Sequence, residues 1–218
     1  MKVFRIGLLS ALLILMMSMV TYAGTVQISL ANLSEVRNII LRFYARNFPS
    51  YTLTSATDNS LIFTSSGQTQ WRGYGVWRDM FTMVTNSDRT VTLNMRADLQ
   101  YSGNNLFNPG AADLTERELY GLRRFRELCD GIYTYGFDHE KGKITEVDPY
   151  GAAAAEGLQV GDRIKLIDGR KWDDPNVIFH YGERAYIEVT VKGKGGERTV
   201  RLKGDYHTPR EAQEAHGI

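Results

Sequence analysis

The strongest pattern of hydrophobic and polar positions lies at residues 90–101, where apolar and polar side chains alternate strictly. The apolar set is Val91, Leu93, Met95, Ala97, Leu99 and Tyr101, and the polar set is Thr92, Asn94, Arg96, Asp98 and Gln100. Such alternation is typical of a β-strand with one face buried and the other in water. Residues 76–84 precede this strand across a turn at 86–89, which predicts a long hairpin. Shorter strand patterns at 51–56 and 60–65 surround a second turn.

Two helical stripes flank these strands. The first consists of Leu33, Val36, Ile40 and Phe43, and the second of Leu119, Leu122, Phe125 and Cys129. Asn32 with Glu35, and Asp113 with Glu116, have the spacing of capping boxes at the two helix starts. Helix, four strands and helix predict an α+β domain over 24–130, in which two helices lie on one face of an antiparallel four-stranded sheet.

This first region contains no catalytic motif. Trp71, Tyr74 and Trp77 cluster near a glycine-rich turn, and we interpret them as aromatic side chains that pack at the edge of the sheet. The second helix also has a basic side. It consists of Arg117, Arg123, Arg124 and Arg126, interleaved with Glu116, Glu118 and Glu127. We interpret this side as a solvated helix face.

The first 23 residues have the pattern of a secretory signal peptide. Lys2 and Arg5 precede the apolar run 6–20, and Thr21 and Ala23 put small residues at the first and third places before an exit site. The run is shorter than the roughly 20 apolar residues that span a membrane. We therefore expect cleavage before Gly24 and an exported protein in the periplasm or cell envelope. The alternative is an inner-membrane anchor formed by residues 6–23.

Charge and residue usage narrow the function further. Lys and Arg total 26 against 25 Asp and Glu, a net charge of +1, without the basic excess of a nucleic-acid-binding protein. A single cysteine excludes an internal disulfide, and four histidines leave few ligands for a metal, so we expect no cofactor. Every lysine of the chain beyond residue 23 lies after residue 130, which predicts a domain boundary there.

Residues 134–203 contain a more specific series of motifs. In order, these are Tyr135-Gly136-Phe137, a run of four alanines at 152–155, Gly157-Leu158, Gly161-Asp162, Asp168-Gly169 and a hairpin at 186–202. Together they resemble a PDZ domain of the bacterial type, in which the strand that completes the sheet comes from the C-terminal end. The resemblance implies a PDZ-like β-barrel or sandwich over 131–206. We expect the polar segment 207–218 to be a mobile tail.

The resemblance also implies a peptide site. By this resemblance, the backbone N–H groups of Tyr135, Gly136 and Phe137 would hold the terminal carboxylate of a peptide that adds as a strand to the sheet edge. Asp138 and His139 would pair with the peptide backbone. A helix at 174–181 would line the side-chain pocket with Val177, Ile178 or Tyr181. This helix and the strand 137–140 are short for the family, so two readings stay open: a working groove, and a PDZ fold kept for structure.

An enzyme is the third reading. PDZ domains of this type often accompany proteases, but the sequence has no HExxH motif and no Gly-x-Ser-x-Gly motif. Cys129 and His139 are a conceivable nucleophile and base, although Cys129 falls on an apolar helix stripe. We predict a non-catalytic binding or scaffolding protein with a protein or peptide partner. The alternatives are a structural envelope protein with a vestigial groove and an envelope hydrolase. Membrane contact is expected only if residues 6–23 are retained.

Overall fold

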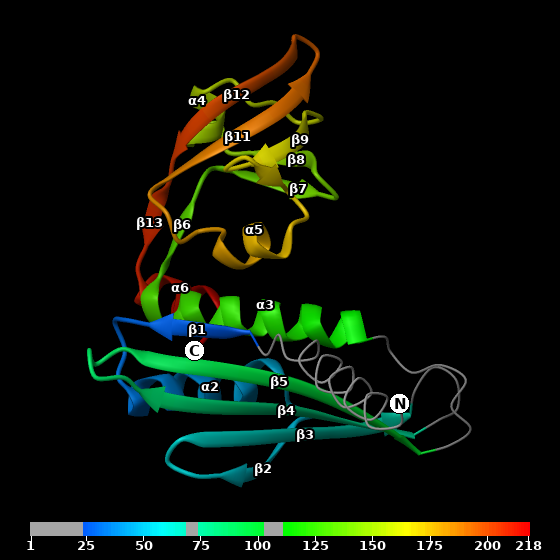
Figure 1. Ribbon diagram of the computed structural model, residues 1–218, viewed down its shortest axis with the longest axis vertical. Helices are drawn as coiled ribbons and strands as arrows, with labels where there is room; N and C mark the ends of the chain where they lie inside the picture. The colour runs from blue at the N-terminus through cyan, green and yellow to red at the C-terminus, as the bar shows by residue number, and fades with distance from the viewer. Residues whose placement is uncertain (1–23, 69–73, 103–110) are drawn as a thin grey trace, which may run out of the picture.

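The computed structural model describes residues 24–68, 74–102 and 111–218 (Figure 1). The predicted signal segment and Trp71 lie outside these ranges. Within them, no helix combines the length and the hydrophobicity that a membrane crossing requires. The chain forms two hydrophobic cores, one built mainly from residues 26–129 and the other from residues 135–202. The first unit lies at the bottom of Figure 1 and the C-terminal unit at the top.

The first unit is an antiparallel sheet covered by two helices. Its elements are β1 (Thr25–Ile28), α2 (Leu33–Asn47), β2 (Thr52–Ala56), β3 (Ser60–Gln68), β4 (Tyr74–Thr85), β5 (Val91–Ser102) and α3 (Ala111–Asp130). The strand order is β1-β5-β4-β3-β2. The sheet therefore has five strands instead of the predicted four. The sequence analysis missed β1 because four residues give too short an alternation to stand out.

One face of this sheet and both helices share a single core. Val91, Leu93 and Met95 of β5 are buried together with Phe81 and Met83 of β4, as the alternation predicted. The helices contribute the apolar stripes seen in the sequence. Their buried members are Val36, Ile39, Ile40, Phe43 and Tyr44 of α2 and Leu122, Phe125, Leu128 and Cys129 of α3. Both helices therefore lie on the same face of the sheet.

The helix starts follow the sequence in one case and not in the other. The Asn32 side chain caps α2 by accepting from the Glu35 N–H, and the Glu35 carboxylate accepts from the Asn32 N–H at 2.8 Å. The first capping box is therefore confirmed. The second is wrong, because α3 begins at Ala111 and Asp113 lies inside its first turn. Trp77 lies on β4, an internal strand, so the prediction that it packs at an edge strand is also wrong.

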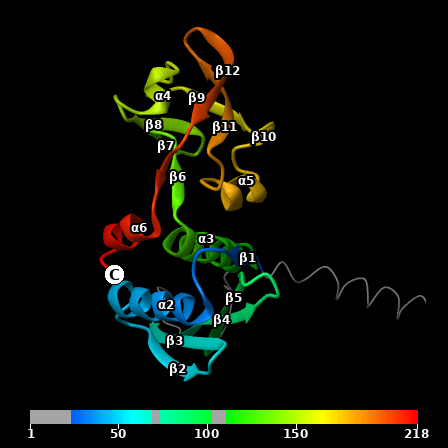
Figure 2. The ribbon, with the colours of Figure 1, turned by 90° about the vertical axis from the view of Figure 1, so that its left-hand side faces the viewer.

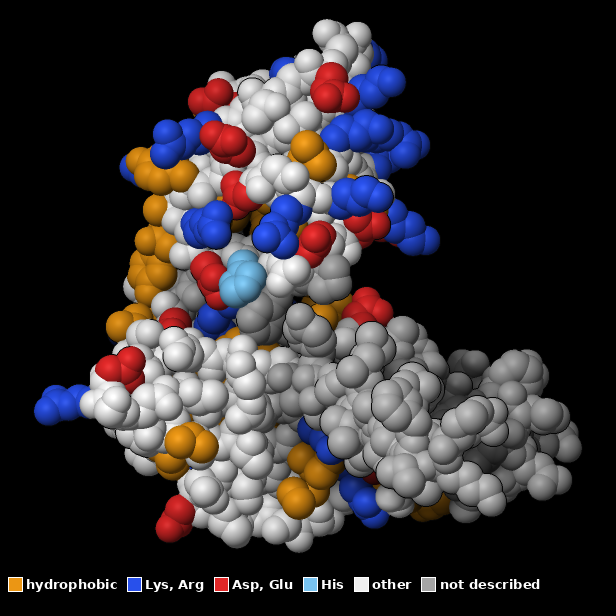
Figure 3. Space-filling view, in the orientation of Figure 1, with side chains coloured by type: hydrophobic (Ala, Val, Ile, Leu, Met, Phe, Trp, Pro, Cys, Tyr) orange, Lys and Arg blue, Asp and Glu red, His pale blue; other side chains and the backbone are white. Residues whose placement is uncertain are grey.

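The C-terminal unit is an open sheet with two short helices. Its elements are β6 (Ile132–Thr134), β7 (Phe137–Glu140), β8 (Lys143–Val147), α4 (Ala152–Ala155), β9 (Arg163–Ile167), β10 (Arg170–Lys171), α5 (Pro175–His180), β11 (Tyr186–Gly193) and β12 (Gly196–Lys203). The order is β12-β11-β9-β8-β7, and β10 pairs with β9. Strands β12 and β7 are the two ends of this order, so the described residues form no closed barrel. On the face shown in Figure 3, Lys and Arg side chains gather over this unit.

The final residues are not a mobile tail. They form β13 (Asp205–His207), which pairs with β6, and α6 (Pro209–Ala215), which returns to the first unit (Figures 1 and 2). Ala212 is buried in the first core. The Gln213 side chain donates a hydrogen bond to the Leu128 carbonyl at 2.8 Å. The expectation failed because seven residues of helix give a weak sequence signal, and their burial comes from contacts with residues far away in the chain.

We expect truncation after residue 207 to weaken the first unit. Burial of small apolar side chains and hydrogen bonds of about 1 kcal/mol each predict a loss of about 2–4 kcal/mol in the free energy of unfolding. Cys129 lines a cavity with Pro209 and Gln213, so its thiol should react faster with a labelling reagent. Chemical denaturation and thiol labelling measure the two effects. Arg210→Ala, which removes only an exposed ion pair with Glu214, is the control, and equal effects in both proteins would contradict the prediction.

Candidate peptide-binding groove

A cavity of about 240 Å³ lies between β7, α5 and α3. It is lined by Tyr120, Arg123, Phe137, Asp138, His139, Ile167, Trp172, Val177, Ile178 and Tyr181. Six of the eight residues that the sequence predicted for a peptide site are in this set. The other two, Tyr135 and Gly136, lie in the loop before β7 and do not line the cavity. We call this cavity and the edge of β7 the groove.

Strand β7 offers one free edge. It ends the strand order and pairs only with β8, where Phe137 lies opposite Val147 and His139 opposite Ile144. The Ile144 N–H donates to Asp162 on the β9 side at 2.9 Å, so Ile144 makes no ladder bond to His139 through this N–H. Antiparallel residue pairs alternate between bonded and non-bonded.

The alternation decides which backbone groups are available. Since the Asp148 N–H donates to the Gly136 carbonyl at 2.9 Å, the next residue, Phe137, presents its N–H and C=O to the open side. His139, two residues further along the strand, has the same orientation, and the irregularity after Asp138 lies in the pairing with β8. The backbone groups of Asp138 face β8 instead. The pairing of Asp138 and His139 with a peptide backbone stays a prediction, and by this alternation the outward backbone groups are those of Phe137 and His139.

The loop before β7 is held by its carbonyls. The Tyr135 carbonyl accepts from the Ala153 N–H at 3.2 Å. Among the described residues, no hydrogen bond is donated by the N–H of Tyr135 or Gly136. Gly136 has φ +75°, and a Cβ there would lie 3.0 Å from the Gly151 Cα. The loop therefore needs glycine at this position and leaves two adjacent donors unused, which is the arrangement of an anion-binding nest.

Tyr135 itself is a core residue. Its side chain is 1% exposed, its hydroxyl donates to the Arg184 carbonyl at 2.6 Å, and burial raises its pKa to about 12. Tyr181 follows α5 directly and packs edge-on against Tyr135, with the ring centroids 5.3 Å apart. Burial raises the pKa of Tyr181 as well. Of the two rings, that of Tyr181 lines the groove.

Helix α5 is as short as the sequence predicted. Asp174 caps it by accepting from the Asn176 N–H at 2.8 Å, Pro175 is its first residue, and Gly182 follows with φ +88°. Its half-buried residues Val177 and Ile178 face the groove.

His139 and Trp172 also line the groove with their aromatic rings. The His139 ring lies edge-on to Trp172, with the ring centroids 5.6 Å apart. The His139 Nδ1 atom is buried and has no hydrogen-bond partner among the described residues. Burial lowers the pKa of this imidazole, which favours its neutral form.

Helix α3 forms a wall of the groove that the sequence analysis did not predict. The Arg123 guanidinium lies 5.2 Å from the centre of the Tyr181 ring, and its Nη1 atom is 3.5 Å from the Ile178 carbonyl oxygen. Arg126 forms an ion pair with Glu183, and its side chain is only 9% exposed. The basic side of α3 is therefore not a solvated face, because the C-terminal unit covers part of it.

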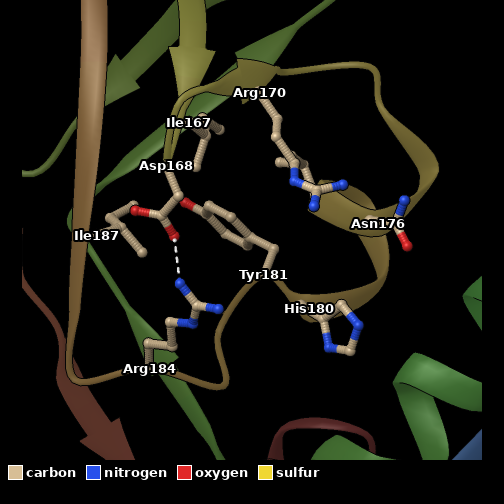
Figure 4. Close-up of a pocket in the computed structure, with 9 residues that line it drawn as sticks. Ile167, Asp168, Arg170, Asn176, His180, Tyr181, Arg184 and Ile187 are labelled. Atoms are coloured by element: carbon tan, nitrogen blue, oxygen red, sulfur yellow. Dashed lines mark hydrogen bonds and ion pairs between the residues drawn. The ribbon is translucent and has the colours of Figure 1, made fainter.

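A second cavity, of about 300 Å³, shares the lining residues Ile167, Val177 and Tyr181 with the groove (Figure 4). Arg184 and Asp168 form an ion pair at 3.2 Å along one side, and Asp168 also accepts from the Glu188 N–H at 2.8 Å. Arg170 and His180 point toward the same space. The side chain of Arg184 is 66% exposed, so this pair contributes little to stability.

The structure does not bring the conceivable enzyme residues together. Cys129 is 2% exposed in the first core, where burial raises the pKa of its thiol, whereas His139 lies in the groove of the C-terminal unit. Within the described ranges, no three His, Cys, Asp or Glu side chains are arranged to hold a metal ion.

Comparison with known proteins adds little to this geometry. No protein-family model matches the sequence, and no curated protein matches it either. Among solved structures, the chain is similar to the HtrA-type protease AlgW with a decapeptide, at 14% identity and a TM-score of 0.34, over 75% of this chain and 66% of that one. It is also similar to the serine endoprotease from Yersinia pestis, at 14% identity and a TM-score of 0.33, over 72% of this chain and 64% of that one. The chain thus spans under two thirds of the length of either protease. Because these identities and TM-scores are low, the fold and the function are argued from the residues of this chain.

Proposed function

We propose that the protein is an exported, non-catalytic binding module with a PDZ-like C-terminal unit. Its groove receives the C-terminal end of a partner protein or peptide by strand addition. The observation that carries this proposal is the free edge of β7, where the backbone groups of Phe137 and His139 point outward beside a cavity with both apolar and polar walls. For the hydrolase alternative, Cys129 is buried in the first core, away from His139, and the described residues contain no cluster of His, Cys, Asp or Glu that could hold a metal ion.

The bound peptide lies antiparallel to β7. Its terminal carboxylate accepts hydrogen bonds from the N–H groups of the 135–137 loop, and its backbone pairs with Phe137 and His139. Its last side chain enters the cavity beside Ile178 and Tyr181. Since β7 has four residues and α5 has six, few residues of the peptide are held. We expect affinities on the order of micromolar, or about −8 kcal/mol.

A peptide library displayed with free C-termini and screened against the protein tests this proposal. We expect hits that lose at least about 10-fold in affinity when they are synthesised as C-terminal amides, because an amide offers no negative charge to the loop N–H groups. Calorimetry of the free acid and amide forms gives the ratio. Equal binding of both forms would contradict the carboxylate mechanism.

A structural role is the second candidate, and the short β7 and α5 favour it. In that case, the C-terminal unit keeps its fold to pack against α3. The same screen separates the two candidates, because a structural unit yields no peptide above background.

A further inference from the structure

We propose that the groove is a composite site of both units, in which Arg123 of α3 binds a carboxylate of the bound peptide. The inference rests on the proposed function and adds the class of peptide to it. A peptide with an acidic group is selected, and the acceptor of that group comes from outside the C-terminal unit.

Arg123 is a cation without a carboxylate partner. No ion pair links it to any Asp or Glu of the described residues, and its one hydrogen bond, to the Ile178 carbonyl, is long at 3.5 Å. Glu127 is engaged elsewhere, since it pairs with Arg124 at 2.9 Å. Asp138 lines the same cavity but does not pair with Arg123. A half-buried guanidinium of this kind gains most from a charged ligand, because burial has already removed part of its water.

The electrostatics of the groove agree with this geometry. Burial is the main cause of a lowered pKa for Arg123, and the attraction of Glu127, which forms no ion pair with it, offsets this only in part. Arg123 in turn helps to lower the pKa of His139 and opposes the rise of the pKa of Tyr181. The positive charge of Arg123 therefore acts on two residues of the groove: His139 of β7 and Tyr181, which follows α5.

The position of α3 is fixed by a second contact. Arg126, one turn after Arg123, forms its ion pair with Glu183, and Glu183 also bonds the His180 Nδ1 atom at 2.7 Å. Both arginines thus contact the segment 178–183, which contains the end of α5. This arrangement holds the Arg123 guanidinium beside Ile178 and over the Tyr181 ring. Since the proposed function assigns the terminal carboxylate to the 135–137 loop, the carboxylate at Arg123 is that of an acidic side chain upstream of the peptide C-terminus.

The test uses hexapeptides selected by display against the full protein. We expect Asp or Glu to be enriched among the last residues of the hits. Each hit is synthesised in three forms: unchanged, with the acidic side chain replaced by its amide, and with an amidated C-terminus. The affinity of each form is measured for the wild type and for Arg123→Met, which keeps an apolar stem of similar length. Arg124→Met, which removes a charge from the same helix outside the groove, is the matched control.

We expect the wild type to bind the peptide with the side-chain amide at least about 10-fold more weakly than the unchanged peptide, as for loss of a charge-assisted hydrogen bond. We expect Arg123→Met to bind these two peptides with equal affinity. If the C-terminal amide shows this coupling instead, the carboxylate at Arg123 is the peptide terminus. If neither form is coupled to Arg123, or if Arg124→Met has the same effect, the inference is wrong although peptides bind. If no peptide binds the wild type, the proposed function itself fails.

A second variant tests whether α3 contributes to peptide binding or obstructs it. Arg126→Met loosens α3 from the segment 178–183, so a composite site should bind the acidic peptide more weakly. Tighter binding by Arg126→Met would mean that α3 obstructs the groove, and that result would overturn the inference. Circular dichroism of each variant checks that it is folded.

Discussion

Replacement of Asp79 by Asn should lower the free energy of unfolding by about 3 kcal/mol. The Asp79 side chain is 1% exposed, and three groups bind its carboxylate. Arg117 donates from Nε at 2.9 Å and from Nη2 at 2.6 Å, and the Tyr44 hydroxyl donates at 2.7 Å. Arg117 also bonds the Tyr51 hydroxyl at 2.7 Å. Removal of the negative charge leaves a partly buried guanidinium without its partner, which costs more than the loss of an ordinary hydrogen bond.

Asp98→Asn on the neighbouring strand is the matched control. The Asp98 Oδ2 and Arg78 Nη1 atoms are 3.9 Å apart, and both side chains are more than a third exposed. We therefore expect Asp98→Asn to lower the free energy of unfolding by less than about 1 kcal/mol. Urea denaturation at neutral pH gives both values. A loss for Asp79→Asn as small as that for Asp98→Asn would show that the network around Asp79 does not hold the first unit together.

The second large effect is expected at Gly136. Gly136→Val should abolish peptide binding, because the loop would have to move away from Gly151, whose Cα would lie 3.0 Å from the new Cβ. The positive φ adds a conformational cost of about 1–2 kcal/mol for any residue with a side chain. Calorimetry with the selected peptides and a two-dimensional amide NMR spectrum measure binding and fold together.

Gly157→Val controls for the backbone cost. Gly157 has φ +76°, almost the same as Gly136, but no atom lies within 4 Å of a Cβ built on it. This variant should lose stability and keep its peptide affinity. If both variants bind as the wild type does, the 135–137 loop is not the carboxylate site.

Local patterns predicted most of the secondary structure. The alternation of β5, the Asn32 capping box and the brief α5 each depend on neighbours within a few residues, and each is present in the structure. The candidate groove was predicted differently, because its residues at 135–139 and after Asp174 were implied by the resemblance to PDZ domains. Local patterns alone do not show that two segments so far apart in the chain line one cavity.

Long-range contacts could not be predicted in this way. Arg123 and Arg126 carry the same charge as solvent-exposed arginines, and nothing near them in the sequence shows that residues 178–183 cover them. Asp79 interrupts no pattern, because a polar residue in the middle of a strand usually faces water. Its burial depends on Arg117, which lies 38 residues away. Local sequence patterns therefore do not predict which of these residues pair with each other.

The return of α6 makes the C-terminal unit an insertion within the first unit. The chain leaves the first core at residue 130 and re-enters it at Ala212, and Tyr206 closes this junction by donating to the Asp130 carbonyl at 2.7 Å. During synthesis, residues 24–130 therefore emerge from the ribosome long before the helix that completes their core. Contacts of such large sequence separation form slowly. The first unit should remain incompletely packed, and open to binding by chaperones, until α6 has been made.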